Sequence, residues 1–248
     1  MTRLISVALL FAASLARLAA WADIDIYFLR HGETTWNREG ILQGSISYTD
    51  LTREGELMAE ETAKGMSAAG IRFDRIYTSP YVRARHTAEI LSATGVGPAP
   101  VDDVRLREMC FGRYEGMRYA KGEYPDENLR FFFEEPERYV PQGVGAETFA
   151  DVGARLRDFL ENEVRPLDGK AERVLCVAHS LVLKALVREF AGDSASSEAK
   201  KTIQRNCCVH VLRYADGRFT LKETGRIFYK VPPASVAVPP PPQSSSAR

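Results

Sequence analysis

The stretch LRHGETTWN, from Leu29 to Asn37, directly follows the apolar run IDIYFL, from Ile24 to Leu29. That run is typical of a strand buried on both faces of a sheet. An arginine, a histidine and a glycine at the end of such a strand add little to a core, whereas they can hold an anion beside a nucleophilic imidazole. In open α/β sheets, ligands bind outside the carboxyl ends of the strands. The stretch therefore predicts a reactive anion site around Arg30 and His31.

Strand and helix patterns alternate along the rest of the chain. Short apolar runs predict strands at residues 73–78, 99–101, 173–178, 206–214 and 219–223. Apolar residues at helical spacing predict helices at residues 51–66, 82–91, 127–133, 148–164 and 180–190. Long apolar strands separated by helices are typical of a mainly parallel sheet covered on both faces. We therefore expect an α/β fold, a three-layer α/β/α sandwich, with an antiparallel hairpin around Asp216-Gly217.

Length, charge and cysteine usage narrow the classes of function. The chain of 248 residues suits one domain with a sizeable core. It has 33 basic and 33 acidic residues and a formal net charge of zero, without the basic excess of a nucleic-acid-binding protein. The four cysteines show neither a CxxC pair nor a zinc-like spacing with histidine, which favours free thiols and predicts no metal site.

Both ends of the chain predict segments outside a folded domain at residues 23–230. Arg3, an apolar run at residues 4–16 and Ala20-Trp21-Ala22 have the layout of a signal peptide with its cleavage site, and the run is too short for a stable membrane span. Residues 1–22 therefore predict export to the periplasm or beyond; the alternative is an N-terminal extension of a cytoplasmic protein. Residues 231–248 are rich in proline and serine, which predicts a disordered tail.

Three later predicted strands are each followed by a charged or reactive side chain, namely Arg83, Glu108 and His179. If these strands are parallel neighbours of the first, the three side chains lie close to Arg30 and His31. Two guanidiniums suit phosphate oxygens, and a neutral imidazole is a competent nucleophile toward phosphorus. Glu108 can protonate the leaving oxygen, and a bound phosphate dianion helps it to stay protonated. The set predicts phosphoryl chemistry without a metal.

Four segments, in this order along the chain, carry a resemblance to a known family. They are LRHGETTWN at residues 29–37, SPYVRARHTA at 79–88, LREMCFGRYEG at 106–116 and VLCVAHS at 174–180. The chain resembles the histidine phosphatase superfamily, which holds cofactor-dependent phosphoglycerate mutases and related phosphomonoester phosphatases. The resemblance extends over residues 25–223 and implies a phosphoglycerate mutase-like fold.

The resemblance implies roles for the five reactive residues. His31 would be the phosphorylated nucleophile, and Glu108 would donate and accept the proton. Arg30, Arg83 and His179 would form the phosphate pocket. The implied reaction transfers phosphate to His31 with release of an alcohol, and water then attacks with Glu108 as base. No cofactor is implied.

The resemblance also implies contacts from the surrounding loops. Asn37, with Gln43 and Gly44, would contact phosphate or substrate. Family members usually have glycine after the second catalytic histidine; here it is Ser180, whose backbone N–H can still bind phosphate. Residues 48–52 lack the usual acidic-x-Pro-Leu-Thr form, which leaves the contacts of that loop open.

The segment at residues 109–142 interrupts the alternation of strands and helices. It holds eight aromatic residues and predicts an insertion beside the site. The run Phe131-Phe132-Phe133 is more typical of packing, and a lid over the site is the alternative. These aromatic side chains suggest a bulky or apolar leaving group.

Several polar residues are interpreted as structural rather than catalytic. His86 and His210 fall on a predicted helix and strand, outside the matched motifs. Glu115 is expected to pair with a nearby base, and Glu147 is interpreted mainly as a residue at the start of the helix at 148–164.

Three functions remain open from the sequence. The first is hydrolysis of a small phosphomonoester through phospho-His31. The second is a phosphoglycerate mutase-type transfer, which the short segment at residues 111–144 disfavours because the mutases that this chain resembles carry a long insertion there. The third is a non-catalytic phosphate-binding module, which the intact reactive residues argue against. No nucleic-acid partner is expected, and nothing in the sequence predicts an oligomeric state.

Overall fold

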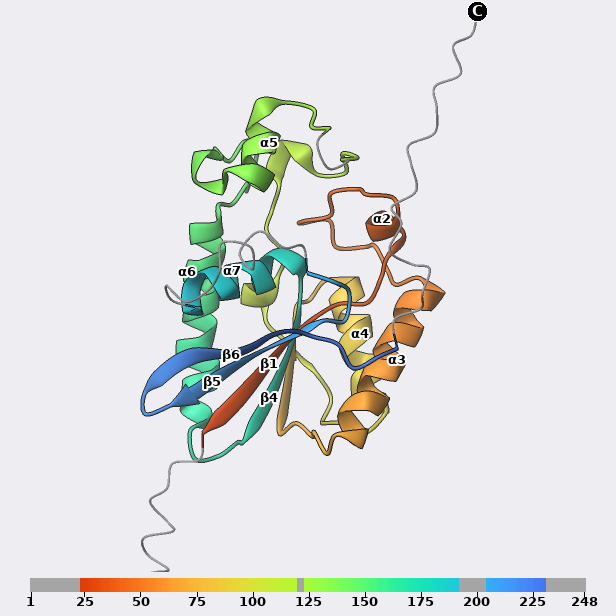
Figure 1. The fold of residues 1–248 in the computed structure, drawn as a ribbon, viewed down its shortest axis with the longest axis vertical. Coiled ribbons are helices and arrows are strands. Elements are labelled where there is room, and N and C mark those ends of the chain that lie inside the picture. Colours follow the sequence, from red (N-terminus) through yellow and green to blue (C-terminus); the bar gives the residue numbers. More distant parts are fainter. Residues whose placement is uncertain (1–22, 120–122, 192–203, 231–248) are drawn as a thin grey trace, which may run out of the picture.

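A computed structural model describes residues 23–119, 123–191 and 204–230, so the predictions for residues 1–22 and 231–248 lie outside the described chain. Within these ranges, six strands form one sheet in the order β3-β2-β4-β1-β5-β6 (Figure 1). The strands are β1 (Ile24–Arg30), β2 (Arg75–Thr78), β3 (Val101–Asp102), β4 (Arg173–Ala178), β5 (Val209–Ala215) and β6 (Arg218–Arg226). None of the helices in this part of the chain is long and apolar enough to cross a membrane.

The centre of the sheet is formed by β1 and β4. These strands run parallel, with Arg30 opposite Ala178, and β2 runs parallel to β4 on its other side. β5 pairs with β1 in the antiparallel sense and turns into β6 through Asp216 and Gly217, whose φ angles are 50° and 75°. Two positive φ values are those of a type I′ hairpin turn. The predicted mainly parallel sheet with an antiparallel hairpin is confirmed.

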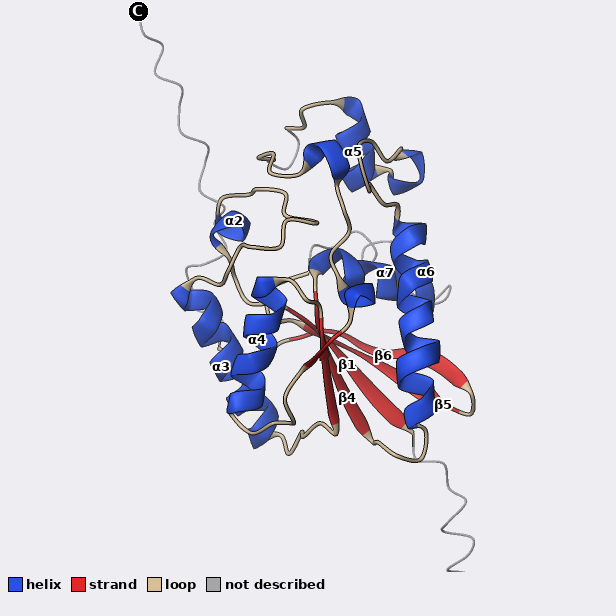
Figure 2. Ribbon diagram, turned by 180° about the vertical axis from the view of Figure 1, so that it is seen from behind, coloured by secondary structure: helices blue, strands red, loops and turns tan. Residues whose placement is uncertain are grey.

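Helices cover both faces of the sheet (Figure 2). The α-helices are α2 (Thr35–Arg38), α3 (Arg53–Ala68), α4 (Val82–Ala93), α5 (Glu127–Glu134), α6 (Phe149–Phe159) and α7 (Ser180–Phe190). On one face, α3 and α4 pack against Leu29 and Val177; on the other, α6 and α7 pack against Phe28 and Cys176. Successive residues of a strand point to opposite faces, so neighbouring residues enter different cores. The three-layer sandwich is therefore confirmed.

Some predicted boundaries shift in the structure. The helix expected at residues 148–164 is α-helical only to Phe159, and Leu160–Val164 form a π-helical turn. Thr52 caps α3 as its sequence suggests, because its hydroxyl accepts the Gly55 N–H at 3.0 Å. In the segment at residues 109–142, α5 lies away from the sheet, above the carboxyl ends of the strands (Figure 1).

Candidate active site

The carboxyl ends of β1, β4 and β2 lie side by side, and each leads into a residue of the candidate site. His31 follows β1, His179 follows β4 and Ser79 follows β2. The His31 N–H donates to the Ala178 carbonyl at 3.0 Å, and the Ser79 N–H donates to the Val177 carbonyl at 2.9 Å. Backbone hydrogen bonding therefore continues one residue beyond the strands and fixes the two histidines beside each other.

A hydrogen bond to the main chain fixes the tautomer of His31. Its Nδ1 lies 2.7 Å from the carbonyl oxygen of Gly32. A carbonyl oxygen can only accept a hydrogen bond, so Nδ1 carries the proton and Nε2 keeps its lone pair. Burial lowers the pKa of His31 well below its usual range, and the charges of Arg83 and Arg30 lower it further. The imidazole is therefore neutral and a competent nucleophile.

Gly32 allows a close approach between the loop after β1 and the helices. A Cβ at Gly32 would lie 2.5 Å from the carbonyl oxygen of Gly55, in the first turn of α3. The Gly32 N–H donates to the hydroxyl of Thr87 on α4 at 3.0 Å. The loop that carries His31 is thus fixed between two helices, and a side chain at Gly32 would displace it.

The two predicted phosphate-binding arginines occupy different positions. Arg30 lines the pocket and donates to the carbonyl of Gln204. Arg83 is fully buried near the start of α4, behind the pocket lining, and donates to the carbonyls of Ile46 at 2.7 Å and Gly44 at 3.0 Å. Burial lowers the pKa of Arg83 to about 10, so the guanidinium stays charged at neutral pH. Arg83 therefore holds a loop of the site and adds positive charge from behind.

His179 is fully buried next to His31. Its Nε2 lies 2.8 Å from the hydroxyl oxygen of Ser79. Burial lowers the pKa of His179 well below its usual range, and the charge of Arg83 adds to this effect. Ser79 is a positioning residue that the sequence reasoning did not assign, because a serine after a strand is also a common turn residue.

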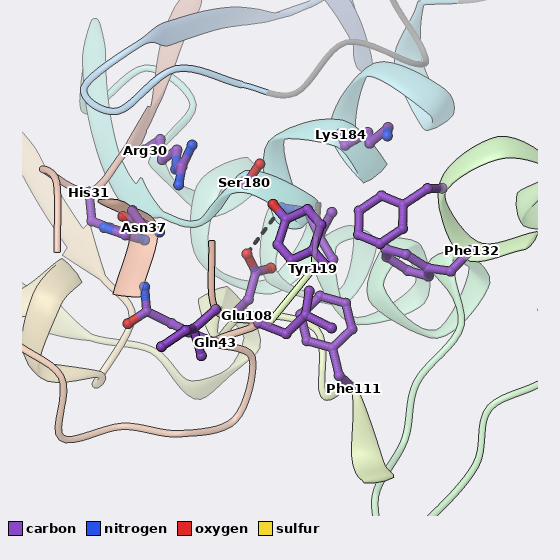
Figure 3. Close-up of a pocket in the computed structure, with 14 residues that line it drawn as sticks. Arg30, His31, Asn37, Gln43, Glu108, Phe111, Tyr119, Phe132, Ser180 and Lys184 are labelled. Atoms are coloured by element: carbon purple, nitrogen blue, oxygen red, sulfur yellow. Dashed lines mark hydrogen bonds between the residues drawn. The ribbon is translucent and has the colours of Figure 1, made fainter. Parts of the chain in front are cut away.

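Glu108 is buried at the base of the pocket (Figure 3). Its Oε1 accepts the Met109 N–H at 2.9 Å, and its Oε2 accepts the Leu181 N–H from the first turn of α7 at 3.2 Å. Burial raises the pKa of Glu108 above its usual range, although these two hydrogen bonds oppose the rise. The carboxyl group can therefore hold a proton at a higher pH than an exposed glutamate.

Asn37 lines the pocket, and a hydrogen bond from Asn206 holds the Asn37 side chain in place. The Asn37 Oδ1 accepts the Thr34 N–H at 3.2 Å and the Asn206 Nδ2 at 3.0 Å. The same Asn206 amide donates to the His31 carbonyl at 3.0 Å. Asn206 therefore connects the chain before β5 to the loop that carries His31. The sequence offered no motif for it.

Gln43 and Ser180 line the pocket, whereas Gly44 stands outside its lining. Gln43 is held by a 2.8 Å hydrogen bond from its Nε2 to the Thr34 hydroxyl. The Gly44 N–H donates to the Glu115 carboxylate at 2.9 Å.

The prediction that Glu115 pairs with a base is wrong. Its carboxylate accepts backbone N–H groups of Gly44, Ser45 and Phe111, the last two at 2.8 Å. These bonds join the loop after Gln43 to the segment after Glu108. A single carboxylate can accept hydrogen bonds from several amides that point toward it.

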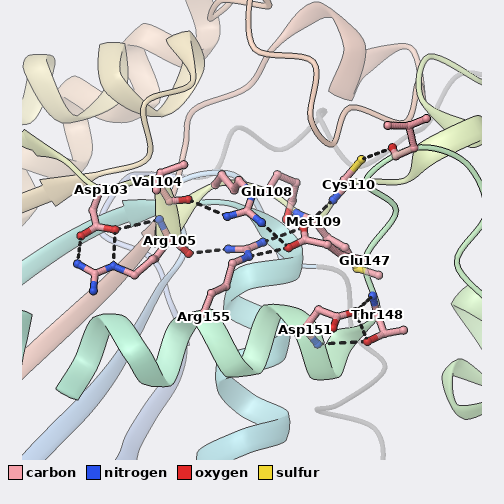
Figure 4. A network of polar contacts seen from close by, with 12 residues as sticks. Asp103, Val104, Arg105, Glu108, Met109, Cys110, Glu147, Thr148, Asp151 and Arg155 are labelled. Atoms are coloured by element: carbon pink, nitrogen blue, oxygen red, sulfur yellow. Dashed lines mark hydrogen bonds and ion pairs between the residues drawn. The ribbon is translucent and has the colours of Figure 1, made fainter. Parts of the chain in front are cut away.

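Glu147 has a larger role than the predicted one at a helix start (Figure 4). Thr148 is the N-cap of α6, and Glu147 precedes it. The Glu147 carboxylate pairs with Arg107 at 2.7 Å and Arg155 at 3.0 Å, and it accepts the Cys110 N–H at 3.0 Å. Glu147 thus holds residues that come before and after Glu108 in the chain, namely Arg107 and Cys110.

His31 is a lining residue of the pocket, whereas His179, His86 and His210 lie outside the lining. His86 Nδ1 is 2.7 Å from Asp50 Oδ1, and His210 Nε2 is 2.7 Å from Gln204 Oε1. The four cysteines are free thiols. Over residues 23–119, 123–191 and 204–230, no group of three or more His, Cys, Asp or Glu side chains is arranged to hold a metal ion.

The pocket has a polar end and an aromatic end (Figure 3). Its empty volume is about 610 Å³, counting space that opens to solvent. The polar end holds Arg30, His31, Asn37, Gln43, Glu108 and Ser180. The aromatic end holds Phe111, Tyr119, Phe132 and Phe133, together with Lys184 of α7. Two members of the Phe131-Phe132-Phe133 run therefore line the site as well as pack in it, so the interpretation as packing alone is incomplete.

Known proteins resemble this chain in sequence and in structure. A probable phosphoglycerate mutase, GpmB, from Cronobacter sakazakii is 33% identical over 193 residues, which are 77% of this chain and 85% of that protein. A metal-independent phosphoserine phosphatase from Arabidopsis thaliana is 30% identical over 199 residues, 79% of each chain. The solved phosphoglycerate mutase of Bacillus anthracis has the same fold, with a TM-score of 0.66, 23% identity and coverage of 83% of this chain and 94% of that one.

A family model also matches most of this chain. The model of the histidine phosphatase superfamily, branch 1, matches residues 26–226. This range includes the loop that carries His31. It also includes Arg30, Arg83, Glu108 and His179. The fold, the four motifs and the family match agree, and the chain belongs to the histidine phosphatase superfamily.

Proposed function

We propose that this protein hydrolyses phosphomonoesters through a phosphohistidine on His31. In the first step, Nε2 of His31 attacks phosphorus, and the bond to the leaving oxygen breaks while Glu108 gives that oxygen its proton. An alcohol is released. In the second step, Glu108 takes a proton from water as the water oxygen attacks phosphorus and the phosphorus–nitrogen bond breaks. Inorganic phosphate leaves, and Glu108 is protonated again.

The opposite pKa shifts of His31 and Glu108 in one pocket carry this proposal. Burial lowers the pKa of the imidazole, which favours the neutral form that a nucleophile needs, and raises the pKa of the carboxyl group, which favours the protonated form that an acid needs. The Gly32 carbonyl fixes the tautomer of His31 that leaves Nε2 for attack. Titratable groups with perturbed pKa values that share one pocket are typical of active sites.

The charges around the pocket support phosphate as the group transferred. Arg30 lines the site, and Arg83 lies behind it with its positive charge retained. A phosphate dianion here would be stabilised by both guanidiniums. Its negative charge would raise the pKa of Glu108 further, which favours the acid role in the first step.

A mutase activity is the second candidate. The two reactions share the first step and differ in the second, where a hydroxyl of the retained substrate replaces water. The relatives include a probable mutase and a phosphatase at 33% and 30% identity, so similarity does not separate the two. The short segment after Glu108 is a weaker argument for hydrolysis than the sequence suggested. This chain covers 94% of a solved protein named as a phosphoglycerate mutase, which leaves little room in that protein for a long insertion.

The experiment is to incubate the protein with 3-phosphoglycerate and with aryl and sugar phosphates and to follow the products by phosphorus NMR. Hydrolysis predicts inorganic phosphate, whereas mutase activity predicts 2-phosphoglycerate. Denaturing samples during turnover should trap a phosphoenzyme that is acid-labile and absent in His31→Ala. Acid-stable label on a serine or threonine, or no turnover on any substrate, would contradict the proposal.

A further inference from the structure

Lys184 is a buried lysine that the proposed mechanism does not use. It lies on α7 four residues after Ser180, and both residues line the pocket. Residues four apart share one face of a helix, so Lys184 faces the pocket about 6 Å further along the axis than Ser180. Figure 3 shows Lys184 near Phe132, across the pocket from His31.

The surroundings of Lys184 are unusual for a lysine. The side chain is 5% exposed, and its Nζ lies 5.9 Å from the centre of the Phe149 ring. Burial, with the nearby Arg188 charge, lowers its pKa to about 8, so the amine is still mostly protonated at neutral pH. The protonated amine attracts anions.

Between the phosphate end and Lys184 the wall is aromatic. The rings of Tyr119 and Phe133 stack at 4.9 Å, and those of Phe111 and Phe132 meet edge to face at 5.2 Å. All four residues line the pocket. A substrate that lies along this wall would place an apolar body against the rings and its far end near Lys184.

We propose that Lys184 is a specificity-determining residue that binds a second anionic group on the leaving group of the substrate. This inference rests on the proposed function. The substrate class is a phosphomonoester whose leaving group has an apolar or aromatic body and carries a carboxylate or a similar anion at its far end. Phosphate binds at Arg30 and His31, the body contacts the aromatic wall, and the anion pairs with the Lys184 ammonium.

The test uses two aryl phosphates that differ in one charge, 4-carboxyphenyl phosphate and its neutral methyl ester. The variants are Lys184→Met, which keeps the length of the side chain without its charge, and Lys184→Arg, which keeps the charge. Lys64→Met is the control, because Lys64 lies on α3 with a 62% exposed side chain that pairs with Glu61. Comparing the ratio of kcat/KM for the two substrates between proteins cancels their different intrinsic reactivity.

We expect wild type and Lys64→Met to have the same ratio of kcat/KM for the carboxylate to that for the ester. Lys184→Met should lose about ten-fold or more in kcat/KM for the carboxylate, mainly through KM, and stay within about two-fold for the ester. Lys184→Arg should restore most of the preference. Thermal melting of each variant shows whether it is folded.

The outcomes separate this inference from the proposed function. Equal losses for both substrates in Lys184→Met, which leave the ratio of kcat/KM for the two substrates as in wild type, would overturn the role of Lys184 and leave the phosphatase mechanism intact. Failure of the wild type on both aryl phosphates and on the wider panel would overturn the phosphatase function and this inference together.

Discussion

The imidazole rings of His31 and His179 lie 5.2 Å apart, with an angle of 63° between their planes. Both rings are buried, and burial lowers the pKa of each. The positive charge beside the two histidines therefore lies on Arg30 and Arg83, and both imidazoles are neutral before substrate binds. A neutral imidazole beside permanent cations suits attack on a phosphate dianion. Arginine keeps its proton at a pH at which histidine has lost its own, so the cations and the neutral nucleophile can be present together.

The loss of activity in the Glu108→Gln variant should be larger for a substrate with a poorer leaving group. An alkyl phosphate needs a proton on its leaving oxygen, whereas p-nitrophenolate leaves without one. We expect a loss of about a hundred-fold or more in kcat/KM for an alkyl phosphate and a clearly smaller loss for p-nitrophenyl phosphate. Steady-state kinetics with both substrates measure this; equal losses would contradict the role of Glu108 as acid.

The pH profile of kcat/KM should have two limbs from the site. As pH rises through the raised pKa of Glu108, the acid loses its proton and the rate falls. As pH falls through the lowered pKa of His31, the nucleophile gains a proton and the rate falls again. The phosphate group of the substrate ionises with a pKa of about 6, and this ionisation changes the pH profile of every variant in the same way. Glu108→Gln should therefore lack the alkaline limb only, and retention of that limb would assign it to another group.

Gly55→Ala should destabilise the protein and reduce its activity. A Cβ at Gly55 would overlap the carbonyl oxygen of Glu33, next to Gly32 in the loop that carries His31. Overpacking of this kind costs about 1–3 kcal/mol in the free energy of unfolding, more than the gain in helix propensity. Urea denaturation and kcat measure the two effects.

A matched control for this change is Gly153→Ala in α6. The nearest atom to a Cβ there is the Glu189 carboxylate oxygen at 3.1 Å, at the end of a flexible side chain. This variant should gain up to about 1 kcal/mol from helix propensity and keep its activity. A loss of stability equal to that of Gly55→Ala would show that any added methyl group is harmful, rather than this contact.

Glu147→Ala should be strongly destabilising. Arg155 is 9% exposed and Glu147 is 10% exposed at the side chain, so the change leaves a buried guanidinium without its carboxylate. Removing one partner of a buried pair costs about 3–5 kcal/mol. Glu161→Ala is the control, because its pair with Arg165 is 44% and 47% exposed and such pairs contribute less than about 1 kcal/mol. Similar denaturation midpoints for both variants would refute the structural role of Glu147.

Much of the fold could be predicted because its signals are local. The apolar runs of β1 and β4, the Thr52 cap and the Asp216-Gly217 turn each depend on a few neighbouring residues. Glu115 and Asn206 could not be assigned, because their partners lie at distant positions in the chain. Glu115 accepts from Gly44, which is 71 residues away, and Asn206 donates to His31, which is 175 residues away.

The sequence by itself determined the order of strands and helices and singled out the candidate reactive residues, since motifs and hydrophobic periodicity reside in short stretches. Only the tertiary structure decided the tautomer of His31, the raised pKa of Glu108 and the place of Lys184 at the far end of the pocket. These properties arise from burial and from hydrogen bonds across the fold, such as that from the Leu181 N–H to Glu108, and both exist only once distant segments have packed together.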